Sequence, residues 1–358
     1  MTHNAITALT LTLSPHVPLS KTRLETLCLL IVAVISARTV NLSHIASERA
    51  GDVLVASTYR RLQRFFQHVA LPEDWSARLV VQVLGLTGPW HLCLDRTNWK
   101  IGKRDVNILM LAIATRRFRV PLMWTVLDKA GSSNTQERVA LMRRYLALFG
   151  AGSIRILLAD REFIGLKWLN FLDANGIAFA IRVKAGLRVD TGDGRRLRLR
   201  SLLAKCRGAR KFRATFPSQG NVAALTLSFA AKRIKGSELL IVASNVTDQN
   251  TLNAYRRRWS IECLFGDTKT RGLNLEDTRL QIAAKLSLLL AIVALAIAWA
   301  NKTASVLIGS GKLKRKTHGY YAKSWFRTGF DEIRRLLRSD PRAAVEPWLK
   351  IPKRPRVV

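Results

Sequence analysis

Residues 90–95 read WHLCLD and residues 154–160 read IRILLAD, so two short apolar runs each end in an aspartate. Apolar runs of this length between polar residues are typical of buried β-strands. Three more runs of this kind occupy residues 107–115, 121–127 and 178–184. The centre of the chain therefore predicts a sheet of at least five strands.

Two helical segments lie among these runs. Residues 135–150 and 165–176 carry apolar residues at helical spacing, and each segment stops at a glycine. The resulting order is strand, strand, strand, helix, strand, helix, strand, which is the order of a ribonuclease-H-like domain. We therefore expect an α/β protein with a ribonuclease-H-like catalytic core.

The segments around this core predict further parts. The insertion is strongly basic, because residues 184–236 carry 14 Lys or Arg and two Asp. Its alternating stretches, among them residues 195–203 and 223–233, favour β-strands. A buried strand at residues 239–244 returns the chain to the core. The expected organisation is a helical N-terminal DNA-binding domain (1–85), a first core segment (86–185), a basic β insertion (186–238), a second core segment (239–300) and a helical, basic C-terminal region for dimerisation or DNA contact (301–358).

The N-terminal domain contains a basic helix at residues 57–69. Arg60, Arg61 and Arg64 lie on one side of this helix. Such a helix can enter a DNA groove as a recognition helix, but it can equally serve only in packing. Both interpretations stay open on sequence alone.

The net charge identifies the class of partner. The 358 residues include 59 Lys and Arg and 24 Asp and Glu, a surplus of +35. A surplus of this size is costly by self-repulsion unless a polyanion neutralises it, and lysine and arginine contacts to phosphates supply most non-specific affinity for nucleic acid. The charge is spread over segments with apolar patterning, unlike the low-complexity tails expected of a merely basic ribosomal protein.

The remaining composition excludes several classes of protein. The four cysteines form no CxxC pair and the histidines form no metal-ligand cluster, so we expect neither a disulfide framework nor a zinc site. The apolar run at residues 286–300 is 15 residues long, short of the roughly 20 needed to span a bilayer. With no signal peptide recognised, these features predict a cytoplasmic protein, free of the membrane.

Residues 253–270, NAYRRRWSIECLFGDTKT, carry the chemistry most directly. On a helix, Tyr255, Arg258, Glu262 and Lys269 fall within one stripe about 60° wide. A phenol, a guanidinium, a carboxylate and an ammonium on one stripe suit a surface that holds a phosphate and a metal ion together. The alternative is a solvated face of ion pairs.

Three carboxylates are candidates for a metal site. Asp95 and Asp160 each end an apolar run, and Glu262 lies on the later helix. Three carboxylates at one edge of a sheet can hold two divalent ions, and oxygen ligands favour Mg²⁺ or Mn²⁺ over zinc. The sequence therefore predicts a site for phosphodiester chemistry.

These motifs resemble those of insertion-sequence DDE transposases. Residues 95–102 (DRTNWKIG), residues 160–165 (DREFIG) and the spacing Tyr-x2-Arg-x3-Glu-x6-Lys from residue 255 are similar to the three motif regions of the insertion-sequence-four family. The resemblance covers about residues 40 to 335. Each motif alone is only moderately specific, whereas the three in this order make the resemblance strong.

The resemblance implies a cut-and-paste DNA transposase that acts as a homodimer on paired inverted-repeat ends and on target DNA. Asp95, Asp160 and Glu262 would be the catalytic metal-binding triad for two Mg²⁺ or Mn²⁺ ions. Tyr255 and Arg258, with Lys269, would contact DNA phosphates, Arg as a bidentate clamp and Lys as a point charge. Members of the family typically cleave through a hairpin intermediate.

One departure from the family concerns the base that relatives flip out and stack on an aromatic residue, often a tryptophan in the insertion. No tryptophan lies between Trp168 and Trp259 here. The candidates for this role are aromatic residues in or near the insertion: Trp259, Phe212, Phe216 and Phe229. Two alternatives remain, a catalytically inactive or co-opted transposase acting as a DNA-binding protein, and a structure-selective nuclease of the same fold.

Overall fold

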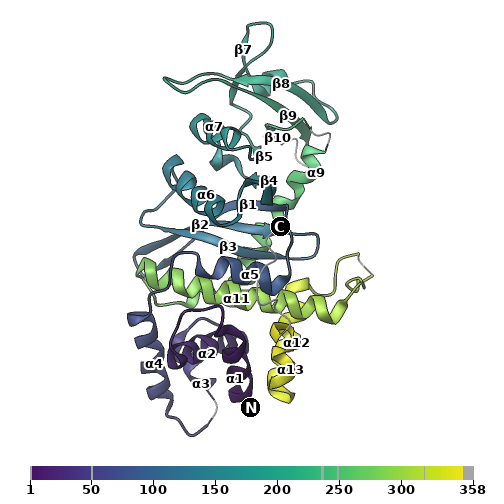
Figure 1. Cartoon of the computed structure of the whole chain (residues 1–358). Helices are drawn as coiled ribbons and strands as arrows, with labels where there is room; N and C mark the ends of the chain where they lie inside the picture. The colour runs from purple at the N-terminus through teal and green to yellow at the C-terminus, as the bar shows by residue number, and fades with distance from the viewer. Residues whose placement is uncertain (1, 50, 235–237, 248–249, 318, 350–358) are drawn as a thin grey trace.

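The computed structural model describes residues 2–49, 51–234, 238–247, 250–317 and 319–349. The last nine residues of the predicted C-terminal region therefore lie outside the described residues. The chain forms an elongated molecule with a helical body at one end, a sheet through the middle and a small β part at the other end (Figure 1).

The predicted order of strands and helices in the core is confirmed. Each apolar run forms a strand and each segment of helical periodicity forms a helix; α6 also begins with a capping box between Asn134 and Glu137. These elements are β1 (Trp90–Ile101), β2 (Arg104–Ala114), β3 (Arg119–Leu127), α6 (Thr135–Phe149), β4 (Ile154–Ala159), α7 (Leu166–Ala174) and β5 (Phe179–Arg182).

The first strand differs from the prediction, because β1 does not end at Asp95 but continues to Ile101. Beyond Asp95, alternate residues Thr97, Trp99 and Ile101 remain buried, and this alternation keeps the strand paired with β2. On its other edge, β1 pairs with β4 only as far as Leu94 opposite Ala159. Asp95 and Asp160 are therefore the next residues on two adjacent parallel strands.

The insertion is part of the same sheet and not a separate one. The ten strands follow the order β3-β2-β1-β4-β5-β10-β9-β8-β6-β7. The outer strands are β6 (Arg188–Asp190), β7 (Arg196–Arg198), β8 (Arg210–Phe216), β9 (Leu225–Arg233) and β10 (Leu239–Ser244).

The strand expected at residues 195–203 is correct only for its first part. After β7, Leu199–Leu202 forms the short helix α8, because Leu199 and Leu203 both enter the core from one helical face.

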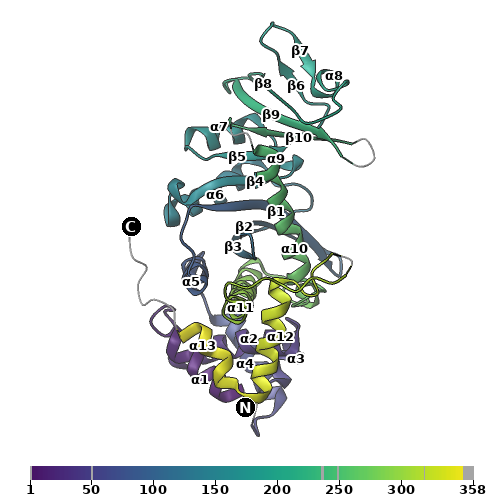
Figure 2. The ribbon, with the colours of Figure 1, turned by 90° about the vertical axis from the view of Figure 1, so that its right-hand side faces the viewer.

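Helices cover both faces of the central strands. Figure 2 shows α6 and α7 on one face and α9 (Thr251–Tyr255) and α10 (Trp259–Thr268) on the other. A 3₁₀ turn at Arg256–Arg258 joins α9 to α10. The face under α9 and α10 carries alternate residues of β1, including Cys93, whose thiol donates to the carbonyl of Arg257 at 3.7 Å.

The N-terminal and C-terminal helices pack into one helical body. Helix α13 packs against α1 and helix α12 against α2, while α11 lies between this body and strand β3 (Figure 1). The helices involved are α1 (Thr2–Leu13), α2 (Lys21–Ala37), α3 (Leu42–Ser47), α4 (Val55–His68), α5 (Trp75–Leu84), α11 (Ala283–Ile308), α12 (Trp325–Ser339) and α13 (Pro341–Leu349).

Helix α11 has the length and composition of a membrane span. It has 26 residues, and its 18-residue apolar window has a mean hydropathy of 2.2. In the fold, however, 78% of that window is buried against other parts of the chain. Trp124 of β3 donates to Ser287, and Asn301 donates to the backbone of Arg119 at the start of β3. The helix is the central core element that joins the sheet to the helical body.

Gly329 of α12 allows α12 to approach α11 closely, and its substitution is expected to destabilise the fold. A Cβ atom at this position would lie 1.8 Å from the carbonyl oxygen of Ala300. Overpacking of this kind typically costs about 1–3 kcal/mol, so Gly329→Ala should lower the midpoint of urea unfolding. The control is Gly152→Ala, where a Cβ would meet no atom within 4 Å. Equal midpoints for the two variants would contradict the prediction.

Candidate active site

The three predicted carboxylates come from three different elements. Asp95 lies within β1, Asp160 follows β4, and Glu262 lies in the first turn of α10. Asp95 is largely buried, and its Oδ1 accepts a hydrogen bond of 2.8 Å from the backbone N–H of Arg96.

Arg258 joins two of these carboxylates. Its Nη1 lies 3.3 Å from Oδ2 of Asp95, and its Nη2 donates to Oε1 of Glu262. The Arg258 side chain is only 12% exposed, compared with 35% for Glu262. The two carboxylates therefore converge on one partly buried positive charge.

Tyr255 connects the third carboxylate, Asp160, to Arg258. Its hydroxyl donates to Oδ1 of Asp160 at 3.4 Å, and its ring centroid lies 5.8 Å from the guanidinium carbon of Arg258. Tyr255 itself is 6% exposed, and its hydroxyl is the atom that contacts a carboxylate. A continuous set of contacts thus runs from Asp160 through Tyr255 and Arg258 to Asp95 and Glu262.

The segment that carries these residues differs in detail from the regular α-helix for which one stripe of side chains is predicted. The 3₁₀ turn tightens it at Arg256–Arg258, but Tyr255 (φ −60°, ψ −30°) and Arg258 (φ −54°, ψ −35°) keep helical backbone angles. Gly266 does not interrupt α10, which continues to Thr268. Tyr255, Arg258 and Glu262 therefore remain close, as their spacing of three and four predicts.

Lys269 lies apart from this cluster. It is the residue at which α10 ends, and its Nζ is 2.7 Å from Glu276 and 3.3 Å from the carbonyl of Asn98. The same Nζ lies 5.7 Å from the ring centroid of Trp99. The ammonium is thus beside the part of β1 that follows Asp95.

The electrostatics of the site favour an additional cation. Burial, foremost, raises the pKa of Asp95 to about 6, and the negative charges of Glu162 and Asp160 act in the same direction. The backbone N–H of Arg96 and the guanidinium of Arg258 oppose this shift without cancelling it. The carboxylate form of Asp95 is therefore disfavoured mainly because the group is buried, and a cation beside it would favour that charged form.

Arg96, which directly follows Asp95, was missed as a functional candidate. Arg96 extends from β1 to Glu162 at 3.4 Å and to the side chain of the buried Asn107 at 3.0 Å. This contact ties the turn after Asp160 to β1 and β2. The available signal was positional, because Arg96 directly follows Asp95 in the sequence.

The donor atoms fit a hard divalent ion, although the described ranges contain no group of three or more His, Cys, Asp and Glu side chains close enough to hold one. Asp95 and Glu262 already direct carboxylate oxygens at one cation, the Arg258 guanidinium. Oxygen-only donors of this kind suit Mg²⁺ or Mn²⁺. The triad would accept such ions if Arg258 moved away and Asp160 joined the other two.

The aromatic candidates differ in accessibility. Trp259, next to Arg258, is 62% exposed, whereas Phe216 is 5% and Phe229 is 1% exposed. Phe212 stacks on Phe229 with ring centroids 5.3 Å apart and borders a cavity of about 280 Å³. In this conformation Trp259 and Phe212 can offer a ring to a ligand, whereas the rings of Phe216 and Phe229 are buried.

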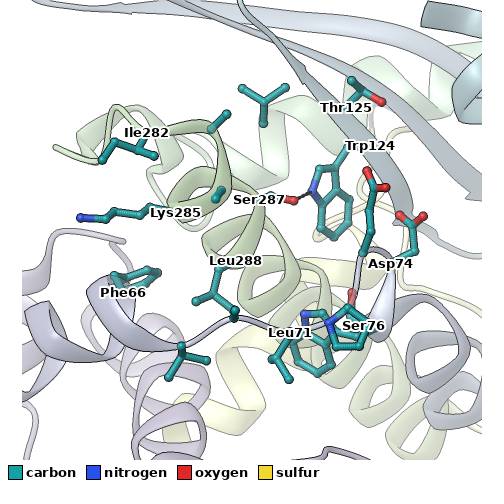
Figure 3. Close-up of a pocket in the computed structure, with 18 of the residues that line it drawn as sticks. Phe66, Leu71, Asp74, Ser76, Trp124, Thr125, Ile282, Lys285, Ser287 and Leu288 are labelled. Atoms are coloured by element: carbon teal, nitrogen blue, oxygen red, sulfur yellow. Dashed lines mark hydrogen bonds between the residues drawn. The ribbon is translucent and has the colours of Figure 1, made fainter.

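A larger cavity of about 610 Å³ lies elsewhere (Figure 3). It is lined by the segment before α5, by β3 and by the start of α11, and none of the three carboxylates borders it. Near its wall, Arg144 pairs with Asp74 at 3.0 Å, with Glu73, and with the carbonyl of Trp124. These contacts join the helical body to the core, so the cavity marks that joint and not the carboxylate site.

The comparison with known protein families identifies the family of the chain. The family model described as the transposase DDE domain matches residues 86–299, which contain the three carboxylates, Tyr255 and Arg258. No curated protein matches the sequence. The matched region is more than half of the chain and contains the central sheet with its covering helices. The chain therefore belongs to the family of proteins with a transposase DDE domain.

Proposed function

We propose that this protein is a cut-and-paste DNA transposase of the insertion-sequence-four family. Membership of the DDE family supports a transposase that acts on DNA, and its members generally use divalent metal ions. The observation that carries the finer proposal is the set of contacts through which Tyr255 and Arg258 connect Asp160, Asp95 and Glu262.

Asp95, Asp160 and Glu262 are the proposed catalytic residues and would hold two Mg²⁺ or Mn²⁺ ions. Such ions, when bound, activate an attacking water or 3′-hydroxyl and stabilise the leaving oxygen of a phosphodiester. The protein's own contribution is position. Strands β1 and β4 bring Asp95 and Asp160 to adjacent strand positions, and α10 brings Glu262 to the guanidinium of Arg258, which also contacts Asp95.

Tyr255, Arg258 and Lys269 are the proposed contacts to DNA phosphates. The fork of Arg258 suits two oxygens of one phosphate, as it now suits two carboxylates. Lys269, beyond Asp95 along β1, would contact a different phosphate from Arg258. Tyr255 would act through its hydroxyl, since its ring is buried.

Cleavage through a hairpin requires a base to leave the stack near the cut. Trp259 supports this pathway best, because its ring is exposed directly beside Arg258. Phe212, half-buried on β8, is the second candidate. Phe216 would need a change in the insertion before it could stack on a base.

The other parts of the chain are proposed to bind and pair the DNA ends. Helix α4 presents Arg60 and Arg64 to solvent, whereas Arg61 is held by Thr26 and Glu25 of α2. This arrangement favours DNA contact by α4 through two of its three arginines. We further propose a homodimer on paired inverted-repeat ends, with the C-terminal region in dimerisation or DNA contact, acting in the cytoplasm at the nucleoid.

The test uses end-labelled duplex DNA that carries the element's own terminus, incubated with the purified protein in Mg²⁺ or in Ca²⁺. We expect Mg²⁺-dependent nicking at the terminus on a denaturing gel, together with a hairpin product. Tight binding without cleavage in any metal would favour the inactive, DNA-binding alternative. Cleavage without preference for the terminus and without strand joining would favour a structure-selective nuclease.

A further inference from the structure

A cluster of basic residues lies around His91, on the strand that also carries Asp95. Residues 91, 93 and 95 alternate onto one face of β1, so His91 and Asp95 lie on the same side. Nη1 of Arg257 is 3.0 Å from each ring nitrogen of His91. Arg257 therefore extends along β1 in the direction opposite to its neighbour Arg258, which contacts Asp95.

The strand register brings two more arginines to this position. His91 pairs with Ala114 of β2, two residues before Arg116, and with Ile156 of β4, next to Arg155. The register shift between Trp90 and His91 places Arg155 at an irregular point of the ladder. Arg116 and Arg155 are both exposed at the surface.

The charges of this cluster act on one another. Burial foremost, and then the positive charges of Arg116 and Arg155, lower the pKa of Arg257. Burial, again foremost, together with Arg257 and Arg155, lowers the pKa of His91 to about 4. His91 is therefore neutral at pH 7 and adds no positive charge to the three guanidiniums.

These arginines differ from most others near the site in their partners. Arg96, Arg119, Arg144 and Arg258 each pair with a carboxylate. Across the residues that the structure describes, no ion pair joins Arg116, Arg155 or Arg257 to an acidic side chain. Three guanidiniums without an acid repel one another, and an anion bound among them would remove that cost.

We propose that the cluster of Arg116, Arg155 and Arg257 around His91 is a binding site for a phosphate of the DNA backbone. This proposal rests on the proposed function in one respect, namely that the bound anion belongs to DNA. His91 and Asp95 are four residues apart on one strand, about 13 Å. This length corresponds to about four base pairs along a duplex. The cluster therefore fixes the direction in which the duplex leaves the carboxylates, parallel to β1 toward its N-terminal end.

The experiment measures binding of a fluorescent 30-base-pair duplex carrying the terminus, by anisotropy in Ca²⁺ over a range of KCl concentrations. Variants are Arg116→Gln, Arg155→Gln and the triple variant that also has Arg257→Gln. Loss of one phosphate contact should reduce the slope of log K against log [KCl] by roughly 0.9 in the triple variant. The half-exposed Arg104→Gln, whose arginine pairs with Asp128, is the matched control.

A second measurement locates the contact. Single phosphates of the duplex are replaced in turn by neutral methylphosphonates, and the wild type should lose affinity at a phosphate about four base pairs from the one that the carboxylates address. The triple variant should no longer respond to that replacement. An unchanged salt slope in a folded triple variant, or equal responses of both proteins, would overturn the proposal. Cleavage is not read in either measurement, so failure of the catalytic proposal would be seen separately.

Discussion

Asp95→Asn is expected to abolish strand cleavage while DNA binding is retained. The substitution keeps the size of the side chain and its hydrogen bond from the Arg96 N–H, but it removes a negative charge at the point where β1 and β4 separate. Metal assistance contributes several kcal/mol to such reactions, so the cleavage rate should fall by roughly 10³-fold or more. Single-turnover cleavage of the labelled terminus measures the rate, and anisotropy measures the binding.

Asp128→Asn is the matched control for this substitution. Asp128 is 91% exposed just after β3 and pairs with the half-exposed Arg104. This variant should cleave like the wild type. If Asp95→Asn cleaved at more than about a tenth of the wild-type rate, less than 1.4 kcal/mol would depend on this carboxylate, and the assignment of the triad would be wrong.

Arg258→Ala is expected to strengthen the binding of Mn²⁺ in the absence of DNA while weakening cleavage. In the wild type, the guanidinium pairs with both Asp95 and Glu262, so a divalent ion must compete with it for the same oxygens. Removing one partner of a largely buried ion pair leaves the other charge uncompensated at a cost of about 3–5 kcal/mol. Part of that cost is recovered when Mn²⁺ binds, so the affinity should rise at least about tenfold.

Titration calorimetry with Mn²⁺ and the cleavage assay measure the two opposed effects. Arg258→Lys keeps a positive charge but loses the two-pronged geometry, so its Mn²⁺ affinity should lie between those of the wild type and the alanine variant. Arg104→Ala serves as the control, because its partner Asp128 is exposed and far from the signature in sequence. Weaker Mn²⁺ binding by Arg258→Ala would mean that Arg258 supports the ion instead of competing with it.

The core could be predicted from the sequence because its signals are local. Five apolar runs and two helical segments with glycine stops determine the order of the elements, and the structure confirms them. The proximity of Tyr255, Arg258 and Glu262 could also be predicted, since spacings of three and four bring residues together on any helical turn.

Features that depend on tertiary partners could not be predicted in the same way. The continuation of β1 past Asp95 was hidden because polar residues alternate with Thr97, Trp99 and Ile101 there. The ion pair from Lys269 to Glu276 depends on how the chain turns after α10. The spacing of apolar residues in the sequence does not predict the path of such a turn. Likewise, the packing of α13 on α1 joins the first and last described helices, and the sequence of neither helix predicts which other helix it packs against.

The pairing of β9 with β10 has a mechanical consequence for any DNA that spans the insertion and the core. Because each strand pairs with its neighbour from β3 to β7, the insertion and the core share one ten-stranded sheet, and β9 pairs with β10 over six residues of each strand. If the sheet keeps its shape, a duplex that contacts both the basic outer strands and the carboxylates has to adapt its own path to the sheet. Flexible base steps such as TA and CA bend at the lowest cost. Where the duplex has to bend, the protein would therefore favour DNA ends that carry such steps at the bend.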